Sequence, residues 1–222
     1  MSANPRWGAI GWLVGVAEFV AGMAIAQAGW TGSTYSLLTN YISDLGNTVC
    51  APYDGRAVCS PWHLVFNVAI GLMGLLLIAG IFGMRQWFPP GTWREAALVV
   101  LGIGGAGAVG VGLNPENVNP AAHVASAFLA FLLTNVAVVA LGVHEERAHR
   151  SRGFAVYSIG SGVVGLLALA LFAAHAYGPL GAGGMERLIV APVLLWAIVT
   201  AVSALRRPLS VTAAPASAAT LG

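Results

Sequence analysis

Three histidines of this chain each fall at the end of a long apolar stretch, on one side of the membrane that these stretches predict: His63, His123 and His175. Neutral imidazoles together with a carboxylate form the usual shell of a catalytic zinc ion, which keeps one position open for water. We therefore predict a zinc site with these histidines as ligands and with Asp44 or Glu116 as acid or base. The chain has no His-x-x-x-His pair, so the ligands would come from separate helices. A metal-free polar site and plain interfacial residues are the alternatives.

One acidic residue lies inside an apolar stretch. Glu18 stands in the middle of the first stretch, where an ionisable side chain costs roughly 2.5–3.5 kcal/mol even on a lenient insertion scale. We expect Glu18 to face the bundle interior, as a proton carrier, general base or ligand anchor, or as a neutral acid hydrogen-bonded to another helix. Asn67 follows His63 by four residues and so shares its helical face, one turn deeper. The three residues predict a polar track into the membrane.

A glycine-rich segment leads into the last apolar stretch and ends in the pair Glu186 and Arg187. Four glycines within residues 178–184 allow a flexible or closely packed backbone there. The pair has two interpretations. Both residues can be ordinary first-turn residues of a helix, or Arg187 can hold an anionic head group or pair with Glu116.

The elements that must position these residues are membrane-spanning helices. The chain of 222 residues is 58% hydrophobic and 8% charged, whereas a soluble domain carries about 25% charged residues. A span needs about 20 mostly apolar residues, and six stretches qualify: 8–28, 62–83, 96–113, 121–143, 154–177 and 188–205. The sequence thus predicts an all-α integral membrane protein with six spans, and the glycine-rich third and fifth spans as its central helices. Its formal charge of +2 does not indicate nucleic-acid binding.

Arginines are sorted by side. The termini and the second and fourth connections hold most of them: Arg6, Arg85, Arg94, Arg147, Arg150, Arg152, Arg206 and Arg207. The opposite side holds Arg56 and Arg187. Because arginine marks cytoplasmic loops, both termini are predicted to be cytoplasmic. We expect one transmembrane domain over 1–207 and a disordered cytoplasmic tail over 208–222.

The longest connection, residues 29–61, is predicted to be external and holds the only two cysteines, Cys50 and Cys59. On an oxidising side a disulfide is the natural interpretation, with free thiols or a metal pair as alternatives. Apolar residues at helical spacing over 35–46 predict a short helix at the interface or dipping back among the spans. Asp44 at its end can cap the following turn or belong to a site.

Several short motifs resemble a known family. They are Ile42-Ser43-Asp44-Leu45-Gly46, Phe66-Asn67 with Gly71 and Gly74, and Gly184-Met185-Glu186-Arg187 before Pro192. Together they resemble domain-of-unknown-function family 998, small bacterial and archaeal membrane proteins. The resemblance covers about residues 8–205 and implies a polytopic fold in the cytoplasmic membrane. It singles out Asp44, Glu186 and Arg187.

A looser likeness is to the membrane hydrolases that include alkaline ceramidases, which use serine, aspartate and three histidines around zinc. Ser43, Asp44 and the three histidines supply those residue types, although this chain has six spans where those enzymes have seven. The resulting hypothesis is a metal-assisted hydrolase acting on a lipid or a lipid-linked substrate. The alternative is a protein that binds or transports a small molecule or a lipid without catalysis. A third hypothesis is a subunit that acts only by packing against a partner.

Overall fold

The structure, a computed structural model, describes residues 5–206. Within these residues six long helices follow one another: α1 (Pro5–Ala28), α2 (His63–Met84), α3 (Thr92–Leu113), α4 (Pro120–Arg147), α5 (Arg152–Ala173) and α6 (Gly181–Arg206). All six are long and apolar enough to cross a membrane. The prediction of an all-α, multi-pass membrane protein is confirmed. The predicted tail over 208–222 lies outside the described residues, and the cytoplasmic placement of the termini stays a prediction.

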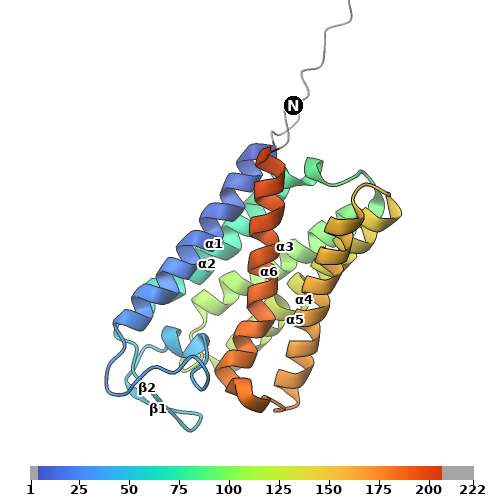
Figure 1. The fold of residues 1–222 in the computed structure, drawn as a ribbon. Helices are drawn as coiled ribbons and strands as arrows, with labels where there is room; N and C mark the ends of the chain where they lie inside the picture. The colour runs from blue at the N-terminus through green and yellow to red at the C-terminus, as the bar shows by residue number, and fades with distance from the viewer. Residues whose placement is uncertain (1–4, 207–222) are drawn as a thin grey trace, which may run out of the picture.

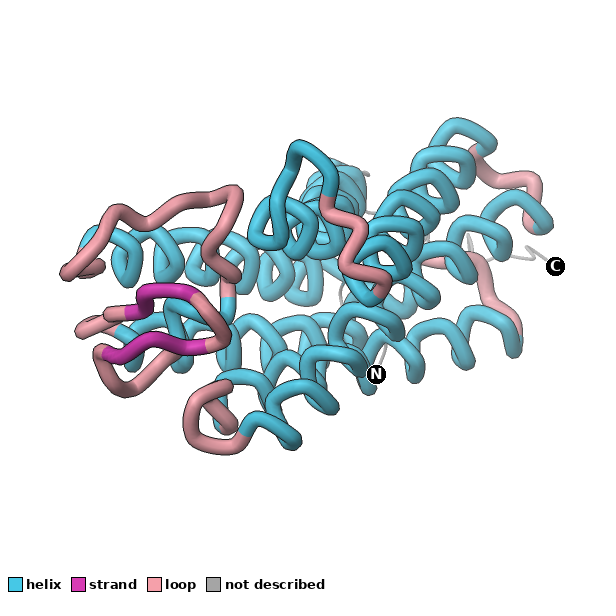
Figure 2. Tube along the Cα trace, turned by 90° about the horizontal axis from the view of Figure 1, so that it is seen from below, coloured by secondary structure: helices cyan, strands magenta, loops and turns pink. Residues whose placement is uncertain are grey.

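The six helices form a ring in sequence order. Each helix packs against the helices before and after it in the chain, and α6 returns to pack against α1. The first residues of α1 and the last of α6 therefore lie side by side (Figure 1). The segment 29–61 lies at the opposite end, which we call the loop end (Figures 1 and 2). The third and fifth spans are members of this ring, so the prediction that they are central helices is wrong.

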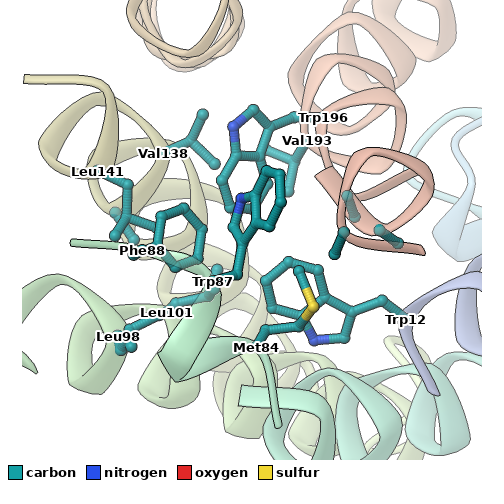
Figure 3. Packing of buried hydrophobic residues seen from close by; sticks show 14 of the residues in the cluster. Trp12, Met84, Trp87, Phe88, Leu98, Leu101, Val138, Leu141, Val193 and Trp196 are labelled. Atoms are coloured by element: carbon teal, nitrogen blue, oxygen red, sulfur yellow. The ribbon is translucent and has the colours of Figure 1, made fainter. Parts of the chain in front are cut away.

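The largest apolar cluster joins α1, α3, α4 and α6 to the connection between α2 and α3 (Figure 3). Its aromatic side chains pack against one another. The ring centroids of Trp12 and Trp196 are 5.6 Å apart, and Phe88 stacks on Trp196 with a centroid separation of 6.2 Å. The indole N–H of Trp12 donates to the carbonyl oxygen of Leu77 on α2 at 3.0 Å. Large, rigid aromatic side chains contribute much apolar contact. Here they connect α6 to α1 and to the connection between α2 and α3.

Two polar side chains deep in the spans also connect helices. The amide nitrogen of Asn135 on α4 donates to the carbonyl oxygen of Ile189 on α6 at 3.2 Å. The indole N–H of Trp196 on α6 donates to the hydroxyl of Ser158 on α5 at 2.9 Å. Interhelical hydrogen bonds of this type stabilise helix association in lipid, where burial of apolar surface alone does not.

The connection 29–61 holds a small hairpin instead of a long helix. Strands β1 (Ala51–Tyr53) and β2 (Arg56–Val58) pair antiparallel. Asp54 and Gly55 join them, and both have positive φ, as the tight turn of a two-residue hairpin requires. A disulfide between Cys50 and Cys59 flanks the strands, which confirms the predicted pairing.

The predicted helix over 35–46 is mostly wrong. Only η1, a 3-10 helix (Ser43–Gly46), forms there. The preceding residues are turns whose polar groups bond to nearby side chains; for example, the amide of Ser36 donates to Asn40 Oδ1 at 3.0 Å. Such local side-chain bonds compete with helix formation. The alternative of a segment that dips back among the spans is correct for residues 42–46, which are buried.

Helix bounds differ most from the sequence estimate where charged residues end the apolar windows. α4 continues past 143 to Arg147, and α6 begins at Gly181 instead of 188. The backbone hydrogen bonds of a helix do not require apolar side chains, so both helices continue into the polar residues that flank the apolar stretches. In contrast, α5 ends at Ala173, and His175 beyond it has φ +56°. Two further 3-10 helices, η2 (Arg85–Trp87) and η3 (Gly178–Leu180), lie between the long helices.

The contact between α3 and α4 requires glycine at Gly107. A Cβ atom at this position would lie 2.6 Å from the backbone nitrogen of Ala130 and 2.7 Å from the carbonyl oxygen of Ser126. The two backbones can approach this closely only because Gly107 has no side chain.

We expect Gly107→Val to lower the free energy of unfolding by about 1–3 kcal/mol, because the helices must separate to accept the side chain. Gly160→Val on α5 is the matched control, since an added Cβ there meets nothing within 4 Å. The measurement is reversible unfolding in detergent. Equal losses in the two variants would contradict the close α3–α4 contact.

Candidate functional site

Residues 42–46 insert into the loop end of the helix ring, and we call them the inserted segment. Their apolar side chains, Ile42 and Leu45, join Phe19 of α1 and Phe66 of α2 in one buried cluster. Gly46 lies against α2, where an added Cβ would collide with Asn67. The amide nitrogen of Asn67 donates to the carbonyl oxygen of Gly46 at 3.0 Å. Asn67, predicted as a binding residue, therefore holds the inserted segment.

The carboxylate of Glu186 holds the inserted segment from the other side. Glu186 lies near the start of α6 and is 3% exposed. One of its oxygens accepts the backbone N–H of Ile42, and the other accepts the hydroxyl of Ser43 at 3.2 Å. A buried carboxylate is tolerated only when such donors replace its water. Glu186, predicted as a binding residue, thus lies where the inserted segment enters the ring.

His123 completes a chain of polar groups with Ser43. Its Nε2 atom lies 3.1 Å from Ser43 Oγ, and its Nδ1 atom lies 2.8 Å from the carbonyl oxygen of Asn114. Because a carbonyl oxygen only accepts, Nδ1 carries a hydrogen. When the imidazole is neutral, the lone pair of Nε2 faces the serine hydroxyl. Ser43 stands between this lone pair and the carboxylate of Glu186.

Asp44 forms a buried ion pair beside this chain. Its side chain is fully buried, and its oxygens accept Arg56 Nη2 and Nε, each at 3.0 Å. The side chain of Asn40 and the backbone N–H of Tyr41 donate to the same carboxylate. The Arg56 guanidinium lies 3.9 Å from the centroid of the Tyr41 ring. Asp44 and Arg56 thus join the hairpin to the inserted segment. For Asp44, the sequence had left two roles open, a cap of the following turn and membership of a site.

Glu116, in the connection between α3 and α4, lies at the edge of the same cluster. Its carboxyl accepts the Asn47 amide at 3.0 Å and lies 4.0 Å from Arg56. Burial, with a further contribution from the negative charge of Asp44, raises the pKa of Glu116 to about 9. Glu116 therefore holds a proton at neutral pH, so the negative charges close to Arg56 are those of the buried Asp44 and the exposed Asp54.

Arg187 does not pair with Glu116. It donates to the carbonyl oxygens of Leu37 at 3.1 Å and Asn40 at 2.9 Å, and to the hydroxyl of Tyr35. We expected the guanidinium N–H groups of Arg187 to bind an anionic head group or a carboxylate. They bind instead to carbonyl oxygens of the turn before the inserted segment. Arg187 fastens this turn to α6.

A cavity of about 80 Å³ lies inside the ring beneath the inserted segment. One water needs roughly 10–15 Å³ on the same scale, so the cavity is several times that size. Side chains of α1, α2, α3, α4 and α6 line it, nearly all of them apolar. The polar exceptions include Ser43 and Glu186, which lie at the loop end, and Thr134 on α4. The arrangement is an apolar chamber with a polar end.

The three histidines predicted as metal ligands lie in different surroundings. His123 is buried beside Ser43, as described above. His63 bonds through Nδ1 to the Ser60 carbonyl oxygen at 3.1 Å, and the exposed His175 bonds to the Tyr177 hydroxyl at 2.8 Å. Over residues 5–206 no three side chains of His, Cys, Asp or Glu are grouped so that they could hold a metal ion. The residues that the zinc hypothesis relied on do not come together.

Glu18 lies apart from the cluster at the loop end. It lines a groove between α1 and α2 with exposed residues such as Ala21 and Leu64, so it faces the surface of the bundle and not its interior as predicted. Its Oε1 atom is buried without a hydrogen-bond partner among the described residues. The predicted track from His63 through Asn67 toward Glu18 is therefore not continuous.

Arg56 and Ser43 are the main site residues that the sequence reasoning undervalued. Arg56 entered it only as one of two arginines on the predicted external side. A usable signal existed, because Asp44 on that side needs a counter-charge and few cations are present. Ser43 entered only through the two family resemblances, and nothing in its spacing from His123 indicates that the two side chains meet.

Asp44→Asn should destabilise the loop end by about 3–5 kcal/mol, because it leaves Arg56 half-buried without its main counter-ion. Asp54→Asn removes the other carboxylate that contacts Arg56, but that side chain is 72% exposed, so the loss should stay below about 1 kcal/mol. Thermal unfolding and protease resistance of the segment 29–61 provide the measurement. A loss in Asp54→Asn as large as in Asp44→Asn would contradict the assignment.

Glu116 also predicts a pH dependence. Its pKa is about 9 in the fold and ordinarily 4.5, so folding binds a proton between these values. The stability contributed by Glu116 is full below about pH 4.5 and is lost as the pH rises toward 9. Glu116→Gln, which does not ionise, should flatten the fall in unfolding free energy between pH 5 and pH 9. An unchanged slope in the variant would show that Glu116 is ionised in the fold.

Comparison with known proteins agrees with the resemblance of the short motifs. The family model described as "Protein of unknown function (DUF998)" matches residues 13–203. No curated protein and no solved structure matches the chain significantly. The match extends from the first helix to the last and includes the inserted segment, Glu186 and Arg187. This membrane protein therefore belongs to the DUF998 family, whose function is unknown.

Proposed function

We propose that this membrane protein binds one amphiphilic molecule inside its helix ring. The observation that carries the proposal is the cavity, which is apolar along α1, α2, α3, α4 and α6 and ends at a hydroxyl and a carboxyl group. Apolar cavities of this kind exclude water and accept apolar groups. A polar group at one end orients such a ligand.

The lining defines the chemistry of the ligand. Among the residues that line the cavity, Glu186 is the one with an ionisable side chain, and both of its oxygens already accept hydrogen bonds. A ligand with a strongly charged head group would find no counter-charge there. An alkyl or acyl chain with an uncharged polar end, such as an alcohol or an ester, fits both the apolar walls and the end at Ser43.

Transport is a weaker proposal for the same site. Transporters place their ligands at discontinuous helices near the midplane, whereas the six long helices here run unbroken through the described residues. The inserted segment is fastened by Glu186, Asn67 and the Asp44–Arg56 pair, which favours a closed binding site.

The test uses a medium-chain alcohol that carries bromine at the end of the chain away from the hydroxyl. Bromine quenches tryptophan fluorescence at short range, and Trp12 lines the cavity. Quenching by this probe should saturate in the wild-type protein, and its saturable part should fall in Trp12→Phe. Ala130→Phe fills the cavity from α4 and should weaken binding about tenfold or more.

Ala170→Phe is the matched control, since Ala170 faces outward on α5 and the same side chain there should leave binding unchanged. Quenching that stays linear with probe concentration, or that is equal in the two phenylalanine variants, would contradict the proposal.

A further inference from the structure

We propose that Ser43 is a nucleophile and His123 its general base, in a site that hydrolyses carboxylic esters whose apolar chain occupies the cavity. This inference rests on the proposed function, since the cavity must first bind the chain. It replaces the metal-centred chemistry expected from the sequence with a serine–histidine pair.

The geometry of the pair fits proton transfer from serine. Ser43 Oγ and His123 Nε2 are 3.1 Å apart, within the range for a nucleophile and its base. The bond from Nδ1–H to the Asn114 carbonyl oxygen, at 2.8 Å, fixes the tautomer and the ring orientation. Asn114 lies just beyond the C-terminus of α3, and His123 lies in the first turn of α4. The base is therefore held by two helices, and the nucleophile by the inserted segment.

The number of hydrogens shared by Glu186, Ser43 and His123 determines where the serine hydroxyl points. The Ser43 hydroxyl has one hydrogen but faces two acceptors, the Glu186 carboxyl at 3.2 Å and His123 Nε2 at 3.1 Å. Both contacts are hydrogen bonds only if the chain from Glu186 to His123 holds one more proton. In the structure Ser43 donates to Glu186. When Glu186 instead holds the additional proton, its carboxyl group donates to Ser43 Oγ, and the serine hydrogen turns to Nε2. In this arrangement the hydrogen of the serine hydroxyl points at its base, His123 Nε2.

The reaction proceeds in two balanced steps. In the first, Ser43 Oγ bonds to the ester carbonyl carbon while its proton moves to His123 Nε2. The bond from that carbon to the alcohol oxygen then breaks, and the proton on Nε2 passes to the departing alcohol. In the second step a water molecule attacks the acyl-serine and gives its proton to Nε2. Cleavage of the Ser43 ester bond returns that proton to Oγ and releases the carboxylic acid.

The surroundings indicate the class of substrate. Ser43 and Glu186 line the polar end of the cavity, with apolar walls below them, so an acyl chain below the serine brings its ester carbonyl to Oγ. The neutral carbonyl of Asn114 orients His123 but adds no negative charge, in contrast to the carboxylate of a complete triad. A base with this weaker support suits esters, whose leaving group departs more readily than the amine of an amide.

The probe that tests this is a fluorophosphonate with a medium-length alkyl chain, applied to the full-length protein in detergent micelles. Attack by Ser43 forms an Oγ–P bond and releases fluoride, which marks the residue permanently. We expect mass spectrometry to find the label on Ser43 of the wild-type protein. Ser43→Ala and His123→Gln should lower labelling, and hydrolysis of a medium-chain p-nitrophenyl ester, by about 100-fold or more.

Ser33→Ala is the matched control, because Ser33 is an exposed serine of the same connection whose hydroxyl accepts the indole N–H of Trp30; it should be labelled and active like wild type. Each variant is also tested for saturable quenching by the brominated alcohol, which shows that its cavity is intact. Quenching without label on wild-type Ser43, or unchanged hydrolysis in Ser43→Ala, overturns the esterase inference and leaves lipid binding standing. Absence of both quenching and label overturns both proposals.

Discussion

The loop end of this protein depends on one buried carboxylate. Glu186 reaches from α6 to the inserted segment and accepts both the Ile42 backbone N–H and the Ser43 hydroxyl. Removing a carboxylate from water costs several kcal/mol unless donors replace the lost hydration. Those donors come from a segment more than 140 residues away in the chain. The inserted segment therefore has one position in which it supplies hydrogen-bond donors to Glu186. In that position it covers the loop end of the helix ring.

The cavity and the polar cluster follow from this position. Once the inserted segment lies against Glu186, Ile42 and Leu45 bury their side chains beside Phe19 and Phe66, and Ser43 meets His123. Asp44, next in sequence, points the other way and anchors the hairpin through Arg56. One short segment thus separates an ionic cluster on its loop side from an apolar chamber on its membrane side. The proposed binding of an amphiphile depends on the chamber, and the proposed ester hydrolysis depends on the serine at its border.

Sequence reasoning predicted the six spans because twenty-residue apolar stretches have few other solutions, and it found the disulfide because the chain has only two cysteines. It also selected Asp44, Asn67, Glu116, Glu186 and Arg187, which gather at the loop end as polar residues near a membrane border tend to do. It did not predict which of them contact one another. Those contacts depend on how the inserted segment enters the ring, and no spacing along the chain encodes that. The surroundings of Glu18, His63 and His175 were not predicted either, since depth in the membrane does not determine which face of a helix a residue occupies.

Hydrogen exchange of the purified protein, followed by mass spectrometry, tests the central claim most directly. Residues 42–46 are packed inside the helix ring, with Glu186 and Asn67 bonded to their backbone. Peptides covering these residues should therefore exchange as slowly as the helices, while the exposed turn at Asp54 and Gly55 exchanges quickly. Exchange of residues 42–46 as fast as that turn would mean that the segment does not close the ring, and the cavity would lose its polar end.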